Sequence, residues 1–376
     1  MQLTLVIHSL TSGGAERVVS IMANYWAAKD WTVTLLTMVD ESIPPFYNLD
    51  ARIKYVPLGI AKSSPDPIRA LLNNIKRIET LRASIIEHKP DAVISFMDTT
   101  NVLTLIATWG LNIPVIVDEQ IHPAMLSCGR SWEVLRQWTY PRASRVVAIT
   151  ARALSYFSPQ IQLRGCVIPN PSPSVDIHEH SSGKVLDKPS LIAVGRLEEQ
   201  KGFDLLLQAF AKLKDRYPEW KLIVLGEGSL RSELESLRNQ LGLAERVDFR
   251  GVVKNPHDFL KQADIFVMSS RFEGFPNALC EAMACGLPVI STDCPSGPRE
   301  IIREGIDGIL VPNEDVSALA IAMERLMASE DERKRLAARS PEVTERFSLE
   351  KVMGMWEALI NEVMREMQNN TRQKNN

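Results

Sequence analysis

Several features that this 376-residue sequence lacks narrow its class. Its five cysteines form neither a CxxC pair nor a zinc-binding spacing, so we expect small buried thiols in a reducing cytoplasm. The net charge of -3 argues against a general nucleic-acid-binding protein. The longest apolar run, NVLTLIATWGLNIPVIV, is interrupted by polar residues and proline, so no membrane-spanning helix is predicted. The opening MQLTLVIHSL has no basic n-region and predicts a first strand, not a signal peptide.

Short β-rich runs alternate with helical patterns along the chain, which is typical of parallel sheets with crossover helices. The strand candidates fall into two series. The first series is LTLVIHS, TVTLLTM, DAVISFM, IPVIVDE and RVVAIT. The second is SLIAVGR, KLIVLGEG, VDFRGVV, IFVMSS, LPVIST and GILVP.

The segment 167–190 separates the two series and predicts a linker, because it is rich in proline, serine and charge. We therefore predict an α/β fold with two Rossmann-like, doubly wound domains facing each other across a cleft. The first domain comprises residues 1–170 with an amphipathic helix at 348–368 that returns to it, and the second comprises residues 171–347. The polar tail 369–376 is predicted to be disordered.

In such sheets ligands bind beyond the carboxyl ends of the strands, so the strand-to-helix turns are the places to look for chemistry. The turn HSLTSGGAERVV places Gly13 and Gly14 before a helix that is predicted to begin at Ala15. A glycine pair lets backbone N–H groups approach an anion, and a helix N-terminus adds partial positive charge. The alternative is a tight turn without a ligand. The pattern is neither a Walker A loop nor a complete GxGxxG fingerprint, so no dinucleotide is indicated.

The turn AVGRLEEQKGFDLL carries two cations at the end of a predicted strand. Arg196 leaves the strand, and Lys201 precedes the next helix. Arginine binds phosphate through its planar fork and lysine as a point charge, so the pair suits a diphosphate. A single loop cation would be expected to be solvated, but two in one loop favour the phosphate interpretation.

The turn SRFEGFPNALCEAMACG places two acids around the start of a short helix. Glu273 precedes the helix and Glu281 lies in about its second turn. The backbone N–H groups of Phe275, Asn277 and Ala278 are predicted to be unpaired there, so an anion could dock on them. Carboxylates on either side can accept hydrogen bonds from sugar or ribose hydroxyls. The alternative is that Glu273 caps the helix and Glu281 is a surface acid.

The stretch FEGFPNALCE resembles the E-x7-E motif of the family 4 glycosyltransferases, which have the GT-B fold and transfer sugars from nucleotide donors with retention. The motifs GGAER, IPNP, GRLxxxKG, GEG, FxGxV and GLPVIST follow in that family's order, so the resemblance covers nearly the whole chain. FMDTTN and CPSGPREI resemble the subset that builds polyprenyl-diphosphate-linked glycans and surface polysaccharides.

The resemblance implies a role for each matching residue. Arg196 and Lys201 would hold the donor diphosphate and stabilise the leaving nucleotide. Glu281 would bind the ribose hydroxyls, and Glu273 the hydroxyls of the transferred sugar. The other implied donor-side positions are Gly13 and Gly14 near the diphosphate, Gly226 in a strand-end turn, Val253 at the nucleobase, and the amides of Phe275, Asn277 and Ala278.

One site departs from the family's pattern. Many relatives place His or Arg just after the Glu that ends the IPVIV strand, whereas this chain reads DEQIHP. Either Gln120 serves there as a neutral hydrogen-bond donor, or His122 enters the site; a lone His beside Pro is otherwise an ordinary loop residue.

The resemblance implies a hexosyltransferase or N-acetylhexosaminyltransferase, and we expect it to be metal-independent and to use no cofactor. No D-x-D pair lies near a predicted strand end, and the loop cations with a helix N-terminus can meet the charge of the leaving diphosphate. The resemblance implies a nucleotide-sugar donor, with uridine diphosphate favoured, and a glycan or polyprenyl-linked acceptor. Two alternatives stay open: an epimerase or phosphorylase with the same fold, and a non-catalytic sugar-binding scaffold.

Two predicted helices suggest where the protein meets a membrane. Basic and aromatic residues in these segments could face anionic lipid, each cation contributing about 1 kcal/mol. We therefore expect a cytoplasmic protein that docks on the inner face of the plasma membrane; ordinary amphipathic surface helices are the alternative. The residues are Arg69, Lys76, Arg77, Arg82 and Lys89 in the first segment, and Arg130, Trp132, Arg136, Trp138, Tyr140, Arg142 and Arg145 in the second.

Overall fold

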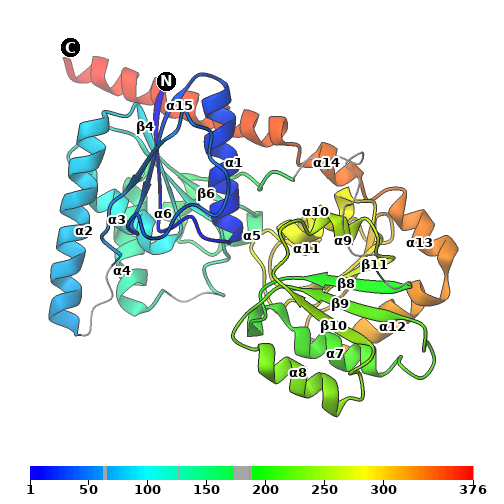
Figure 1. Ribbon diagram of the computed structural model, residues 1–376. Helices are drawn as coiled ribbons and strands as arrows, with labels where there is room; N and C mark the ends of the chain where they lie inside the picture. The colour runs from blue at the N-terminus through cyan, green and yellow to red at the C-terminus, as the bar shows by residue number, and fades with distance from the viewer. Residues whose placement is uncertain (62–65, 126–127, 173–185, 187–188, 376) are drawn as a thin grey trace. The chain divides into compact units, whose positions relative to one another are not determined.

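The computed structural model describes residues 1–61, 66–125, 128–172, 186 and 189–375 (Figure 1). The chain divides into two compact units, of which unit 1 comprises Met1–Asn170 with Glu350–Asn376, and unit 2 comprises Pro171–Leu349. Most of the predicted linker, residues 173–185 and 187–188, lies outside the described residues. Each unit contains one parallel sheet with helices on both faces (Figure 1), so the predicted α/β class is confirmed.

The sheet of unit 1 has the strand order β3-β2-β1-β4-β5-β6-β7. Its interior strands are apolar and buried, and the sequence predicts all of them. The sequence-based prediction does not include β3 and β7, because these edge strands are short and only partly buried. The strands are β1 (Gln2–Ile7), β2 (Thr32–Thr37), β3 (Lys54–Pro57), β4 (Ala92–Phe96), β5 (Val115–Glu119), β6 (Arg145–Ala148) and β7 (Gly165–Val167).

Local signals start several helices of unit 1. The Asp66 side chain caps α2 by accepting the N–H of Arg69, with a proline at the first helical position. Thr150 caps α5 in the same way. The helices are α1 (Gly14–Ala28), α2 (Pro67–His88), α3 (Asp98–Ala107), α4 (Arg130–Thr139), the 3₁₀ turn η1 (Tyr140–Arg142), α5 (Ala151–Ser155), α6 (Pro159–Gln162) and α15 (Leu349–Asn375).

The C-terminal helix α15 packs on unit 1 through its apolar face and through ion pairs. Arg145 at the start of β6 contacts Glu362 and Glu366 of α15, with 2.5 Å between Arg145 Nη2 and Glu366 Oε1. The helix reaches Asn375 and so includes most of the tail that we expected to be disordered. A helix begun in a packed segment adds one backbone hydrogen bond for each further residue, which offsets the polar composition.

The sheet of unit 2 has the strand order β10-β9-β8-β11-β12-β13, and the sequence predicts all of these strands. They are β8 (Ser190–Val194), β9 (Lys221–Leu225), β10 (Val247–Gly251), β11 (Ile265–Met268), β12 (Val289–Asp293) and β13 (Gly308–Pro312). The helices are η2 (Glu199–Lys201), α7 (Phe203–Ala211), α8 (Arg231–Gln240), α9 (His257–Leu260), α10 (Asn277–Ala284), α11 (Pro298–Ile301), α12 (Val316–Ala328), α13 (Glu330–Ala337) and α14 (Glu342–Arg346).

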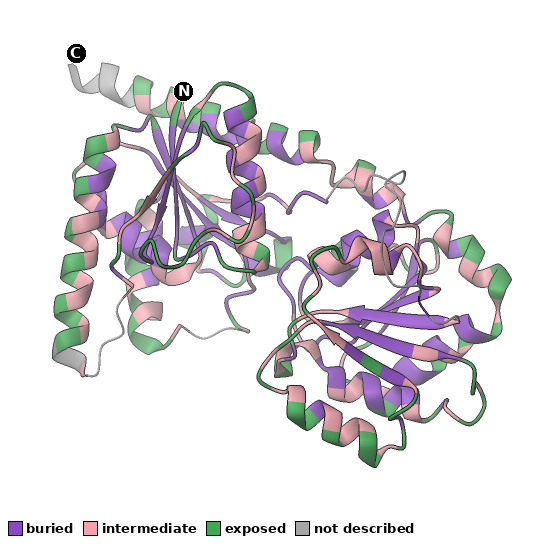
Figure 2. Cartoon of the chain, in the orientation of Figure 1, coloured by how far each residue is buried: buried purple, intermediate pink, exposed green. Residues whose placement is uncertain are grey.

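Helices cover both faces of this second sheet. Figure 1 shows α9, α10 and α11 on one face and α7, α8 and α12 on the other. The strands form the buried centre of each unit, and exposed residues gather on the outer faces of the helices (Figure 2). Among the described residues, no helix is both long enough and apolar enough to span a bilayer. All five cysteines are free thiols, of which Cys280 and Cys294 are buried.

Candidate active site

Two strand-end loops of unit 2, after β8 and after β11, are fastened together. Gly202 has a φ of +61°, and a Cβ there would lie 2.2 Å from the carbonyl oxygen of Ser269. Ser269 Oγ donates to the carbonyl of Lys201 at 3.0 Å, and the N–H of Arg271 donates to the carbonyl of Gln200 at 2.8 Å. Only glycine permits this close backbone approach, so the contact fixes where the Lys201 loop lies.

This fastening brings Lys201 and Glu273 together. Lys201 Nζ lies 2.6 Å from Glu273 Oε1, and Ser270 Oγ donates to the same oxygen at 2.6 Å. The Glu273 side chain is 6% exposed and that of Lys201 is 21% exposed. Within the part of the chain that the structure describes, no group donates to Glu273 Oε2. The carboxylate is therefore held in place and can still accept a hydrogen bond from a ligand.

Arg196 lies beside this pair at the end of β8. A Cβ on the neighbouring Gly195 would lie 3.2 Å from Cδ of Lys201, and a Cβ on Gly226 would lie 1.9 Å from the carbonyl oxygen of Gly195. The ends of β8 and β9 therefore meet at Arg196 and Gly226. The Arg196 side chain is exposed and forms no hydrogen bond or ion pair with a described residue. Its charge is available to a ligand.

The N-terminus of α10 has no cap in the described structure. Pro276 at the N-cap position offers no hydrogen-bonding side chain. The N–H groups of Phe275, Asn277 and Ala278 donate to no described residue, as predicted from the sequence. Oδ1 of Asn277 is also buried without a hydrogen-bond partner among these residues. Because the partial positive charge of a helix end is uncompensated here, the site favours an anion.

Neither acid plays the alternative role considered from the sequence. The Glu273 carboxylate contacts Lys201 and Ser270 instead of capping α10. Glu281 is only 4% exposed, so it is not a surface acid. Its Oε2 lies 4.0 Å from Nε2 of His257 on α9.

Val253 is the predicted donor-side residue with the weakest structural support. It is half-buried and follows the end of β10, the edge strand beside β9. Among the described residues, no hydrogen bond or ring contact links it to the other predicted donor residues.

Sequence reasoning assigned no role to three residues that shape this site. Ser270 was not selected although it lies only three positions before Glu273. Gly202 follows Lys201 in the KG pair, where a glycine before a helix signals a special backbone conformation. His257 carried no local signal, because its approach to Glu281 depends on the packing of α9 against α10.

The glycine turn of unit 1 is partly covered by the chain itself. Gly13 is the N-cap of α1, and a Cβ there would lie 2.0 Å from Glu16 Oε2. Tyr47 donates its hydroxyl to the Gly13 carbonyl at 3.2 Å. A carboxylate in the first turn interacts favourably with a helix N-terminus, so Glu16 occupies space beside Gly13 and Gly14 where we expected an anion.

Gln120 and His122 are both buried and both hydrogen-bonded within unit 1. Gln120 donates through Nε2 to Asp118 Oδ2 at 2.5 Å and accepts at Oε1 from Asn170 Nδ2 at 2.9 Å. Nδ1 of His122 accepts the N–H of Ala124 at 3.2 Å. Burial lowers the pKa of His122, so its ring is neutral at neutral pH. Each side chain contributes to holding the loop after β5, and a ligand contact from either stays a prediction.

The two acids that end β5 belong to the same buried network. Burial raises the pKa of Asp118 to about 8. Burial also raises the pKa of Glu119 to about 7, against the opposing charge of Arg136, whose Nη1 lies 3.8 Å from Glu119 Oε1. The hydroxyl of Tyr140 donates to Glu119. These contacts join the end of β5 to α4 and η1.

Several residues predicted to face a membrane have other partners. Arg136 and Tyr140 are buried, so they cannot contribute to a lipid surface. Arg77 donates to the carbonyl of Ile60. Arg82 donates to the carbonyls of Ala107 and Trp109. Arg145 pairs with α15, as described above.

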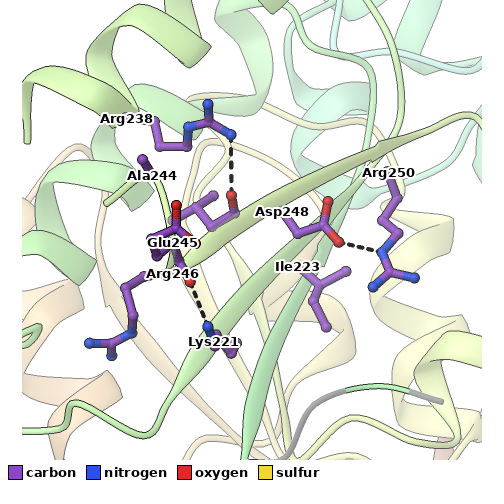
Figure 3. Close-up of a pocket in the computed structure, with 9 residues that line it drawn as sticks. Lys221, Ile223, Arg238, Ala244, Glu245, Arg246, Asp248 and Arg250 are labelled. Atoms are coloured by element: carbon purple, nitrogen blue, oxygen red, sulfur yellow. Dashed lines mark hydrogen bonds and ion pairs between the residues drawn. The ribbon is translucent and has the colours of Figure 1, made fainter. Parts of the chain in front are cut away.

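A cavity of about 220 Å³ lies beside β10 in unit 2 and is lined by several cations (Figure 3). Hydrogen bonds to backbone carbonyls explain these cations. Lys221 donates to the carbonyl of Glu245 at 2.5 Å, and Arg238 to that of Val247 at 3.4 Å. Arg246 donates to three backbone carbonyls. These cations hold loops against the edge of the sheet, unlike the exposed Arg196.

Among the described residues, no group of three or more His, Cys, Asp or Glu side chains could hold a metal ion.

Comparison with known proteins identifies the family. The family described as "Glycosyl transferases group 1" matches residues 174–343, and the "Glycosyl transferase 4-like domain" matches residues 13–171. A Campylobacter jejuni relative is 30% identical over 366 residues, covering 96% of this chain and 99% of the relative. The chain belongs to the glycosyltransferases. That relative is named as the alpha-1,4-N-acetyl-D-galactosaminyltransferase of GalNAc-alpha-(1->4)-GalNAc-alpha-(1->3)-diNAcBac-PP-undecaprenol.

A further relative and two solved structures also resemble this chain over nearly its whole length. The amylovoran biosynthesis glycosyltransferase AmsD of Erwinia amylovora is 27% identical over 357 residues, covering 93% of this chain and 96% of the relative. The structure of Anabaena HepE in complex with UDP has a TM-score of 0.77 at 18% identity, covering 96% of this glycosyltransferase and 99% of that chain. The galactosyltransferase WaaB has a TM-score of 0.73 at 21% identity, with 96% and 99% coverage. The fold of this glycosyltransferase is therefore GT-B.

Proposed function

We propose that this glycosyltransferase moves a sugar from a uridine-diphosphate donor to a polyprenyl-diphosphate-linked glycan, with retention and without a metal ion. The observation that carries the donor side is the uncapped N-terminus of α10 beside Lys201 and Glu273. Free N–H groups and an ammonium group suit a diphosphate, and a fixed carboxylate suits sugar hydroxyls. The Campylobacter jejuni relative named for an undecaprenol-linked substrate supports the acceptor.

The proposed roles combine the arrangement of these residues in unit 2 with the roles that the family resemblance implies. During transfer the bond from the sugar C1 to the diphosphate oxygen breaks and a bond to the acceptor oxygen forms. The acceptor proton passes to the leaving phosphate. Negative charge grows on that phosphate, and Lys201, Arg196 and the amides of Asn277 and Ala278 stabilise it. Glu273 orients the hydroxyls of the sugar, and Glu281 binds those of the ribose.

Calorimetric titration with nucleoside diphosphates tests the donor assignment. We expect uridine diphosphate to bind more tightly than the guanosine and adenosine diphosphates, and chelator to leave transfer unchanged. An equal affinity for all three would overturn the uridine preference, and inhibition by chelator would overturn the metal-free mechanism.

Transfer from UDP-N-acetylgalactosamine to a lipid-linked acceptor distinguishes an enzyme from a sugar-binding scaffold. NMR of the product's anomeric proton tests retention.

The N-terminal half of α2 is the proposed contact with an anionic membrane. Leu71, Leu72 and Ile75 are exposed there, at 62%, 59% and 45% of their surface, and Arg69 and Lys76 are exposed beside them. Apolar residues next to cations are typical of helices that lie in a lipid interface. We expect co-sedimentation with vesicles that contain phosphatidylglycerol, and its loss in Leu71→Ser/Leu72→Ser. Equal sedimentation of this variant and the wild type would refute the assignment of α2 as the membrane contact.

A further inference from the structure

The turn 274–276, which leads into α10, is held in place by packing from neighbouring segments. Gly297, in the loop after β12, has a φ of +97°, and a Cβ there would lie 2.6 Å from both the Gly274 carbonyl oxygen and Cδ of Pro276. Ser296 Oγ donates to the same carbonyl at 3.4 Å. Only glycine permits so close an approach, so the loop after β12 forms one wall of the turn.

A ring from a distant part of the sequence packs against the same turn. Phe275 is only 6% exposed, and its ring centroid lies 5.2 Å from that of Phe347, with the two ring planes 77° apart. Aromatic pairs prefer this edge-to-face geometry. Phe347 ends α14, a helix that packs against α10 (Figure 1). Because the contact restrains the Phe275 side chain, it also restrains the backbone N–H of that residue.

Phe347 itself is fixed by contacts of its own. Its carbonyl accepts the N–H of Ser172 at 2.7 Å. Ser172 lies where the chain enters unit 2, and Phe347 lies where the chain leaves it. The guanidinium of Arg346 lies 5.5 Å from the centroid of the Phe347 ring, and its Nη2 lies 3.3 Å from Oδ2 of the buried Asp307. The ring therefore has a defined position from which it can support the turn.

From these contacts we propose that Phe347 is a positioning residue of the donor site, whose ring holds Phe275 so that the Phe275 amide stays oriented for the donor diphosphate. Phe347 acts through Phe275 and does not touch the donor. The inference rests on the proposed function, because it takes a nucleoside diphosphate as the ligand of this turn. An amide that is already oriented costs less to order on binding, so loss of the ring pair should weaken nucleotide binding.

Calorimetric titration with uridine diphosphate tests this role. We expect Phe347→Ala to raise the Kd by about two- to tenfold, the range that corresponds to the loss of one aromatic pair. Phe347→Tyr keeps the ring and should bind like the wild type. The matched control is Tyr217→Ala, which should leave the Kd unchanged. Tyr217 is also a half-buried aromatic residue of unit 2, but it packs on the hydrophobic core before the start of β9.

A double-mutant cycle separates positioning from a general loss of packing. If Phe347 acts through the Phe275 ring, Phe275→Ala/Phe347→Ala should bind uridine diphosphate no more weakly than Phe275→Ala alone. Urea unfolding shows whether each variant is folded. Should Phe347→Ala fail to fold, Phe347→Leu takes its place, because it keeps much of the apolar volume without the ring.

The outcomes separate this inference from the proposed function. A folded Phe347→Ala or Phe347→Leu protein with the wild-type Kd overturns the positioning role while the proposed function stands. Effects of the two substitutions that simply add, or a Phe347→Tyr protein that binds as weakly as Phe347→Ala, overturn it as well. A wild type that does not bind uridine diphosphate overturns the proposed donor, and the positioning role with it.

Discussion

The carboxyl edges of the two sheets use their polar groups in opposite ways. In unit 2, Arg196 is exposed, and the amides that open α10 donate to no described residue. In unit 1, Asp118 and Glu119 end β5 but are bonded to Gln120 and Tyr140. Unit 2 therefore keeps donors for a ligand, whereas the groups after β5 mainly hold the backbone. Similar topology and similar residue types do not imply the same role.

The largest expected effect is on transfer by the unit 2 site. We predict that Lys201→Ala lowers kcat by a factor on the order of 10² to 10³, because a preoriented charge at the leaving phosphate is lost. The control is Lys212→Ala, which removes a lysine that donates to Ser317 on the surface of the same unit. Wild-type turnover in a folded Lys201→Ala protein would contradict the assignment.

A matched change in unit 1 should affect stability instead of the donor site. Tyr140→Phe leaves the buried Glu119 without its phenolic donor, so the free energy of unfolding should fall by about 1–3 kcal/mol. Uridine diphosphate affinity should stay at the wild-type value. Urea unfolding and calorimetry measure the two quantities, with Tyr156→Phe as the control. If Tyr140→Phe weakened nucleotide binding and left stability unchanged, the contrast between a structural network in unit 1 and a ligand site in unit 2 would be wrong.

The raised pKa of Asp118 predicts how stability depends on pH. The unfolded carboxyl loses its proton near its ordinary pKa of 3.8, whereas the folded one keeps it until about pH 8. Between these values the folded state binds more protons, so rising pH lowers the free energy of unfolding. We expect the wild type to lose stability relative to Asp118→Asn from about pH 4 to pH 8. Parallel stability curves for the two proteins would show that Asp118 ionises normally.

The smallest expected effect concerns the ion pairs of α15. Arg145→Ala removes contacts to Glu362 and Glu366, whose side chains are half-exposed. Such pairs contribute about 0.5–1 kcal/mol, and added salt screens them. Thermal melts at low and high salt measure this loss. The difference in melting temperature between the wild type and Arg145→Ala should shrink as the salt concentration rises. A salt-independent loss would indicate that the arginine stem contributes by packing.

Apolar periodicity predicts the fold well but not its edges. The interior strands of both sheets are continuous apolar runs, which is why the sequence identifies them. The segment KYVP forms β3 although it contains lysine and proline, because an edge strand is paired on one side only. No local pattern reveals that Arg136 is buried, since its burial depends on Glu119 and Tyr140 elsewhere in the chain.

The sequence predicts which strand-end loops come together to form the candidate site, but not how they are held together. The rule for strand ends anticipates that Lys201 and Glu273 approach each other, and the structure places them 2.6 Å apart. The pairing also depends on the contact of Gly202 with the Ser269 carbonyl, which sequence alone does not display. Conversely, the sequence overestimates the space at Gly13, because it does not show where the Glu16 side chain lies.

Hydrogen exchange at the start of α10 tests the central claim most directly. The exchange rates of the Phe275, Asn277 and Ala278 amides are measured with and without saturating uridine diphosphate. If these groups hold the diphosphate, all three rates fall when the nucleotide binds, while the Gly14 amide in unit 1 serves as an internal comparison. Nucleotide binding, verified by calorimetry, that leaves the three α10 rates unchanged would contradict the account.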